Sequence, residues 1–224
     1  MLENVSGINS STALWYASRA TGVVALLLMT AVVLLGLMVT RQGRLPGLPG
    51  FAVSGLHRNM SLIAVVFVAL HVLTAVADSY VYIPLTAAVV PLASPYESLW
   101  IGLGAVSLDI TLAIVVTSLL RRHLSRRLWR AVHLLAYLSW PVAWLHSISS
   151  DTRGMLHGWQ FLLSVGTALV VVAAVGWRLA AAARDVPRAE RVGLLMSAVH
   201  GRNAMRDKLR GSDPLSGRER TSRR

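Results

Sequence analysis

The sequence predicts an all-α membrane protein, a five-span bundle of transmembrane helices with extra helices on the membrane surface. Hydrophobic residues make up 54% of the 224-residue chain, charged residues make up only 14%, and the mean hydropathy is +0.57. Five stretches of about 20 residues or more carry almost no charge, which is the length that crosses a hydrocarbon core. Backbone facing lipid must satisfy its own hydrogen bonds, so we expect these stretches to be helices.

The spans follow one another with short connections of different character. The first span has Trp15 and Tyr16 where an aromatic belt is expected, and no basic segment precedes it, so we expect it to be retained rather than cleaved. A turn rich in Gly and Pro follows it. Between the second and third spans, residues 85–90 are expected to lie along the membrane surface. The five predicted spans are residues 14–40, 57–78, 99–120, 129–149 and 156–178.

The two ends of the chain are expected to lie outside the bilayer. Residues 1–13 form a short polar segment, and residues 179–224 form a basic tail. Within the tail, residues 188–200 have apolar side chains at helical spacing and are expected to form a surface helix. The last dozen residues have the composition of a disordered segment.

The basic residues indicate how the bundle is oriented. Three lie around the first connection, five lie in residues 121–130 and twelve lie from Arg178 onward, so 20 of the 22 share one predicted side. The positive-inside rule then places residues 1–13 outside and the tail in the cytoplasm. We expect the protein to lie in the plasma (inner) membrane of a bacterium. We also expect its basic residues to interact with membrane lipid and not with nucleic acid.

The chain contains no cysteine. This excludes disulfides, Cys-ligated iron–sulfur clusters, zinc–thiolate sites and covalent haem attachment. Any redox chemistry therefore needs a cofactor that is bound non-covalently.

Four histidines form two predicted layers. His57 and His71 lie on the second span, and His133 and His146 lie on the fourth. Each pair is separated by about 20 Å along its helix, so its two members cannot share one metal centre. Because the two spans run parallel, His57 and His133 share the cytoplasmic side, and His71 and His146 share the outer side.

Two imidazoles per layer suit a six-coordinate haem iron, whereas zinc or copper sites recruit three or four protein ligands. The ligand count thus favours two b-type haems over a bare metal ion. On an ideal helix His146 is about 140° from the face of His133, so we expect Pro141 to kink the span and change its phase. The alternative is that these histidines only make hydrogen bonds between helices.

The histidine segments GLHRNMSLIAVVFVALHVLTAVAD and LWRAVHLLAYLSWPVAWLHS resemble the ferric reductase-like transmembrane domain over residues 14–178. That family includes NADPH oxidases, ferric reductases and the haem b membrane subunit of the periplasmic methionine sulfoxide reductase system. The resemblance implies a transmembrane di-haem domain. It also implies that His57 and His133 ligate the cytoplasmic-side haem iron and that His71 and His146 ligate the outer one.

Three charged residues in or beside the spans have two interpretations each. Arg19 is either the partner of an outer haem propionate or a side chain that snorkels to the interface. Arg58 is either the partner of an inner propionate or a positive-inside anchor. Asp109 either pairs with Arg19, orients a histidine or passes protons, or it makes a structural polar contact.

The flavin- and nicotinamide-binding module of the NADPH oxidases has no counterpart in the sequence. The glycine cluster IGLGAVS lies inside the third span rather than at a strand–helix turn. We therefore expect an electron-transfer subunit with a quinol or a separate flavin reductase as donor. The expected acceptor is ferric iron or an extracytoplasmic flavoprotein or reductase. The alternative is a metal-ion or proton transporter, or an assembly protein, that uses these histidines and Asp109.

Overall fold

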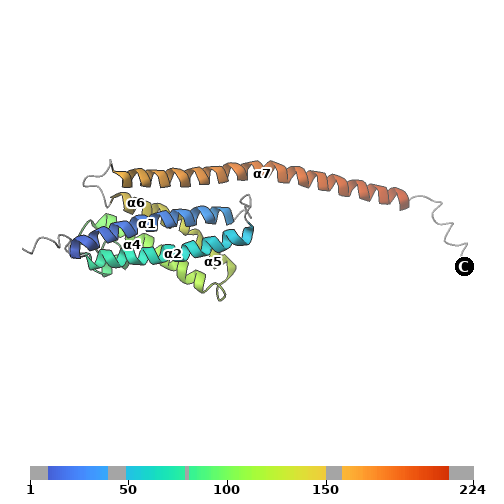
Figure 1. The fold of residues 1–224 in the computed structure, drawn as a ribbon. Coiled ribbons are helices and arrows are strands. Elements are labelled where there is room, and N and C mark those ends of the chain that lie inside the picture. Colours follow the sequence, from blue (N-terminus) through green and yellow to red (C-terminus); the bar gives the residue numbers. More distant parts are fainter. Residues whose placement is uncertain (1–9, 40–48, 79–80, 150–157, 212–224) are drawn as a thin grey trace, which may run out of the picture. The chain divides into compact units, whose positions relative to one another are not determined.

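The described part of the chain is helical. The computed structural model describes residues 10–39, 49–78, 81–149 and 158–211, and no strand occurs in these ranges. This confirms the predicted all-α membrane protein. The helices, drawn in Figure 1, are α1 (Ser10–Val39), α2 (Gly50–Ala77), α3 (Thr86–Val89), α4 (Ser98–Leu119), α5 (Arg126–Leu134), α6 (Ala136–Ser149) and α7 (Trp159–Gly211).

Four described helices are long and apolar enough to cross a membrane. They are α1, α2, α4 and the first part of α7, with spans of 27, 28, 22 and 25 residues. The fourth predicted span, residues 129–149, is divided between α5 and α6, which have 9 and 14 residues. The structure thus has four continuous spans and one broken pair of helices where we expected five continuous spans.

The break between α5 and α6 lies at Leu135. There the Leu135 N–H donates to the Val132 carbonyl at 3.0 Å, and the Leu138 N–H donates to the Leu135 carbonyl at 2.9 Å. Such three-residue bonds wind the chain more tightly than an α-helix and so change its phase. The structure thus has a tightened turn at Leu135, in addition to the Pro141 to which we assigned the change of phase. Pro141 lies inside α6, where it has no N–H to donate to the carbonyl of residue 137.

The helices of the bundle are joined by small polar side chains. α1 packs along α2, and α6 packs against both α1 and α4. The Trp140 indole N–H donates to Thr30 Oγ1 at 2.9 Å and so joins α6 to α1. The Ser139 hydroxyl lies 3.1 Å from the hydroxyls of Ser107 and Thr111, which joins α6 to α4. Hydrogen bonds between small residues are a common way to associate helices where both sides of the interface are apolar.

The connection between α2 and α4 packs against the bundle. The predicted surface segment 85–90 contains α3, whose Ala87 is 1% exposed and which contacts α4. Leu92 has a positive φ of 66° and its backbone nitrogen would lie 2.9 Å from a Cβ at Gly102. Gly102 therefore allows this connection to approach α4 closely.

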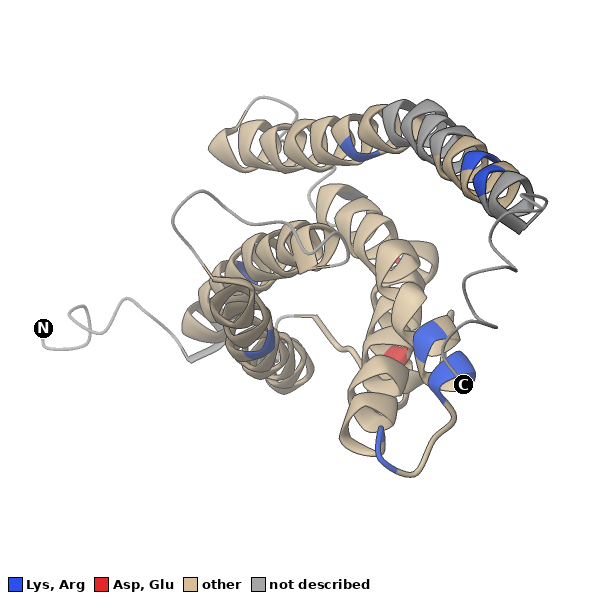
Figure 2. Ribbon diagram, turned by 90° about the vertical axis from the view of Figure 1, so that its right-hand side faces the viewer, with Lys and Arg blue, Asp and Glu red and all other residues tan. Residues whose placement is uncertain are grey.

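The outer surface of the spans is apolar. Leu62 on α2 is 58% exposed and Leu169 on α7 is 64% exposed, and both lie in candidate spans. Figure 2 shows that charged residues occupy little of the helical ribbon. A soluble protein would bury such side chains, whereas lipid solvates them, so the exposed leucines agree with a multi-pass membrane protein.

The chain forms two compact units, residues 1–174 and residues 175–224. The second unit contains the C-terminal part of α7, which includes the predicted surface helix 188–200. Its Met196 and Val199 side chains are exposed. The predicted polar segment 1–13 lies largely outside the described residues, and so does the expected disordered segment at the C-terminus.

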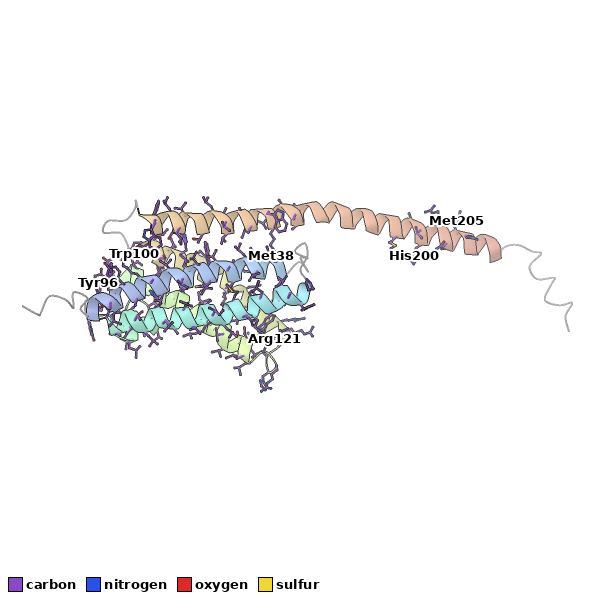
Figure 3. The ribbon with its side chains drawn as sticks, viewed as in Figure 1. Met38, Tyr96, Trp100, Arg121, His200 and Met205 are labelled. Carbon is purple, nitrogen blue, oxygen red and sulfur yellow. The ribbon has the colours of Figure 1, made fainter. Side chains whose placement is uncertain are left out.

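The two ends of the first unit differ in composition, which gives a test of orientation. Figure 3 shows Tyr96 and Trp100 at one end of this unit and Arg121 at the other. From the positive-inside rule we expect a reporter fused to the C-terminus to be cytoplasmic and a reporter inserted within 80–97 to be external. Paired phosphatase and fluorescent-protein fusions measure this directly. Labelling with the opposite sense at both sites would reverse the orientation of the bundle.

Candidate bis-histidine sites

The four histidines meet in two pairs inside the bundle. The ring centroids of His57 and His133 are 6.3 Å apart, with an angle of 74° between the ring planes. The ring centroids of His71 and His146 are 6.2 Å apart, with an angle of 67°. α2 supplies one histidine to each pair, α5 supplies His133 and α6 supplies His146. The structure therefore brings together the residues that the sequence places in the same layer.

Three of these rings are held by a hydrogen bond to backbone. The Nδ1–H of His71 donates to the Ser18 carbonyl at 2.8 Å, and that of His146 donates to the Trp100 carbonyl at 2.7 Å. The Nδ1–H of His57 donates to the Val32 carbonyl at 3.2 Å. Because a carbonyl oxygen only accepts, the proton must be on Nδ1, and the lone pair of the neutral ring is then on Nε2. This is the tautomer and the outer partner that metal-ligating histidines generally have.

His133 is held in another way. Its ring stacks on the indole of Trp129, with centroids 5.0 Å apart and planes 22° apart. The guanidinium of Arg121 lies 4.5 Å from the centroid of the Trp129 ring. Within the described residues, the buried Nδ1 of His133 and the buried Nε1 of Trp129 have no hydrogen-bond partner. His133 thus differs from the other three histidines in the contacts that orient it.

Three glycines lie directly against the histidine rings, and the sequence analysis did not assign them a role. A Cβ at Gly22 would lie 2.9 Å from the His71 ring, and one at Gly104 would lie 2.9 Å from the His146 ring. A Cβ at Gly36 would lie 3.5 Å from the His57 ring. The sequence did contain one indication of these contacts. Gly22 and Gly36 are fourteen residues apart on α1, and so are His57 and His71 on the neighbouring helix α2.

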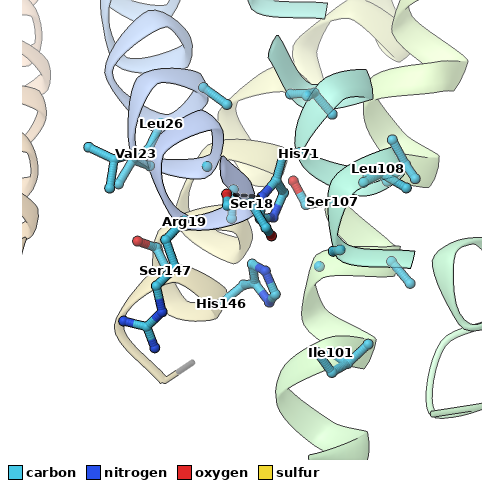
Figure 4. Close-up of a pocket in the computed structure, with 18 of the residues that line it drawn as sticks. Ser18, Arg19, Val23, Leu26, His71, Ile101, Ser107, Leu108, His146 and Ser147 are labelled. Atoms are coloured by element: carbon cyan, nitrogen blue, oxygen red, sulfur yellow. Dashed lines mark hydrogen bonds between the residues drawn. The ribbon is translucent and has the colours of Figure 1, made fainter. Parts of the chain in front are cut away.

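The outer histidine pair lines a cavity of about 310 Å³, shown in Figure 4. This volume is at the lower end of the range found for small-molecule and cofactor sites, about 300–1,000 Å³. Its walls come from α1, α2, α4, α6 and the start of α7, and most of the lining side chains are apolar. A largely apolar cavity with a few polar groups suits a flat hydrophobic cofactor that carries charge at its edge.

Arg19 lines the same cavity. Its guanidinium lies 4.3 Å from the centroid of the Trp15 ring, and Figure 4 shows the side chain beside Ser147. A cation at the rim of an apolar cavity is placed to attract the acidic group of a ligand.

The other polar residues considered, as far as they are described, are not among those that line this cavity. Arg58 is exposed on α2, beside His57. Asp109 is half-buried on α4. His123 and His200 are exposed, and His157 lies outside the described ranges.

The geometry of each histidine pair suits a single metal ion held between two rings. With a metal–nitrogen bond of about 2.0 Å and a ring radius of about 1.15 Å, two imidazoles on opposite sides of one ion have centroids about 6.3 Å apart. The two observed separations are 6.3 and 6.2 Å. Within the part of the chain that the structure describes, no three His, Cys, Asp or Glu side chains form a group suited to a metal ion. Within the described residues, each pair therefore offers two imidazoles.

Comparison with known families places the chain. Residues 21–144, more than half of its length, match the ferric reductase like transmembrane component. The chain belongs to this family. Membership in the ferric reductase-like family indicates a role in membrane electron transfer, together with redox partners and membrane lipid. The match includes His57, His71 and His133 and ends two residues before His146. No curated protein and no solved structure matched the chain.

Proposed function

We propose that this protein carries electrons across the membrane on two b-type haems, one held by each histidine pair. His57 and His133 would be the axial ligands of the cytoplasmic-side haem, and His71 and His146 those of the outer haem. The observation that carries the proposal is the separation of 6.3 and 6.2 Å between facing imidazoles in two separate layers. Haem iron supplies the one-electron redox chemistry that no side chain of this cysteine-free sequence offers.

The residues around the outer pair support haem rather than a bare metal ion. Two imidazoles leave a zinc or copper ion short of ligands, whereas a macrocycle supplies the other four donors. The cavity beside His71 and His146 is largely apolar and has Arg19 in its wall. The apolar walls would exclude water from the cofactor, and Arg19 would pair with a propionate.

The proposed orientation sets the direction in which partners approach. The basic connection between α4 and α5, which contains Arg121, would face the cytoplasm in a bacterial plasma membrane. A quinol or a separate flavin reductase would be the donor on the side of His57 and His133. Ferric iron, or an extracytoplasmic flavoprotein or reductase, would be the acceptor on the side of His71 and His146.

Haem stoichiometry tests the proposal most directly. We expect the protein purified from haem-replete cells to contain about two haems per chain, because each layer has its own pair of axial ligands. Pyridine-haemochrome analysis against a protein assay gives this ratio, and an absorption spectrum identifies the b type. A well-folded preparation without haem would contradict the proposal and would favour a transporter or assembly protein.

A further inference from the structure

The three hydrogen-bonded histidines share one arrangement on the helix that receives them. Each Nδ1–H donates to a backbone carbonyl, and the residue four positions after that carbonyl is a glycine. The same glycine is the one whose Cβ position lies against the ring. We call each such combination a seat. The three seats are Ser18 with Gly22 for His71, Val32 with Gly36 for His57, and Trp100 with Gly104 for His146.

Helix geometry explains why a glycine is needed at that spacing. In an α-helix the carbonyl of residue i accepts the N–H of residue i+4, and its second lone pair faces outward. Side chains on a helix lean toward its N-terminus, so the side chain of residue i+4 covers this region. Without a Cβ at residue i+4, an imidazole from another helix can reach the carbonyl and donate a second hydrogen bond to it.

We propose that Gly22, Gly36 and Gly104 are positioning residues, which expose these carbonyls and so fix the orientation of His71, His57 and His146. The inference rests on the proposed function, because the orientation matters only if the rings ligate metal. With Nδ1 as the donor in all three rings, the lone pair of each neutral ring is on Nε2. In the outer pair both rings have such a glycine, so Gly22 and Gly104 together set the angle between the ring planes, whereas in the inner pair only His57 has one.

Ordinary helix packing does not account for the pattern. Among the described glycines, a Cβ would have neighbours within 4 Å at four positions, and three of those four meet a histidine ring. The fourth, Gly102, meets the backbone and side chain of Leu92 and is a packing glycine. Gly55, which lies on α2 two residues before His57, has nothing within 4 Å and serves as a control.

The seats differ between the two layers. Both outer histidines have tight seats, with hydrogen bonds of 2.8 and 2.7 Å and glycine contacts of 2.9 Å. The inner layer has one looser seat, at His57, where the hydrogen bond is 3.2 Å and the glycine contact is 3.5 Å. No seat is found for His133 within the described residues, and its ring stacks on Trp129 instead. The outer pair is thus oriented more strictly than the inner pair.

Alanine substitutions test the seats in the full-length, haem-loaded protein. We expect Gly22→Ala and Gly104→Ala each to displace an outer histidine, because their Cβ atoms would lie at 2.9 Å from its ring. The EPR g values of a ferric bis-imidazole haem depend on the angle between the ring planes, so the outer signal should shift. Affinity for the outer haem should fall about 10- to 100-fold, the usual effect of losing a partner behind a metal ligand.

Three further variants separate positioning from packing. Gly36→Ala, at 3.5 Å, should shift only the inner signal and by less. Gly55→Ala should change neither signal. Gly102→Ala should lower thermal stability, while the haem that remains bound keeps wild-type g values. If Gly22→Ala does not fold, the EPR g values of Gly104→Ala and Gly36→Ala still test whether these glycines position the histidines.

The opposite results are equally specific. Wild-type g values at full occupancy in the Gly22, Gly104 and Gly36 variants would overturn the inference. The inference also fails if Gly102→Ala shifts the g values as much as Gly22→Ala does. Wild-type protein without haem would instead refute the proposed function, so the two failures are distinguishable.

Discussion

His71→Ala is expected to remove the outer haem and leave the inner one in place. The ratio should fall from about two haems per chain to about one, because an axial imidazole is lost from one layer alone. Within the described residues, His71 and His146 are the two histidines that line the outer cavity, so no neighbouring imidazole replaces the lost ligand. Pyridine-haemochrome analysis measures how many haems per chain remain, and redox titration identifies which of the two haems it is.

The converse variant and a control make this result interpretable. His57→Ala should empty the inner layer and retain the outer haem. His123→Ala, at an exposed histidine of the connection between α4 and α5, should keep both haems. If His57→Ala and His71→Ala each left both haem signals unchanged, the ligand assignment would be wrong.

The second large effect concerns the electron donor. We expect NADH or NADPH alone to give no useful reduction of the purified 224-residue chain, whereas a chemical reductant should reduce both haems fully. A nicotinamide site of the dinucleotide-binding fold has its glycine-rich turn between a strand and a helix. The glycine cluster of the third predicted span lies inside α4, where Gly102 contacts Leu92 and Gly104 contacts His146. These glycines serve packing and histidine contact rather than phosphate binding.

Anaerobic mixing decides this point. The haem bands are followed after addition of NADPH, then after addition of a quinol or a flavin reductase, and finally after addition of dithionite. Reduction by NADPH should appear only when the flavin reductase is present, and a quinol donor should act without NADPH. Fast reduction by NADPH in the absence of any added protein or flavin would show that the chain has a cofactor site of its own.

The sequence was sufficient for the features that depend on local composition and spacing. Uncharged stretches of span length predicted the helices, since lipid leaves the backbone no other partner than itself. The separation of His57 from His71 and of His133 from His146 predicted two layers, because the rise of a helix converts residue number into depth. Family resemblance was visible in the same two segments.

What the tertiary structure decided depends on contacts between helices. The fourth predicted span is divided into α5 and α6 at Leu135, where short-range hydrogen bonds tighten the chain. The carbonyls of Ser18, Val32 and Trp100 accept a hydrogen bond from a histidine because the packing of the helices brings that ring beside them. A sequence shows that a residue is glycine, but which ring fills the space beside it is set by how the helices pack.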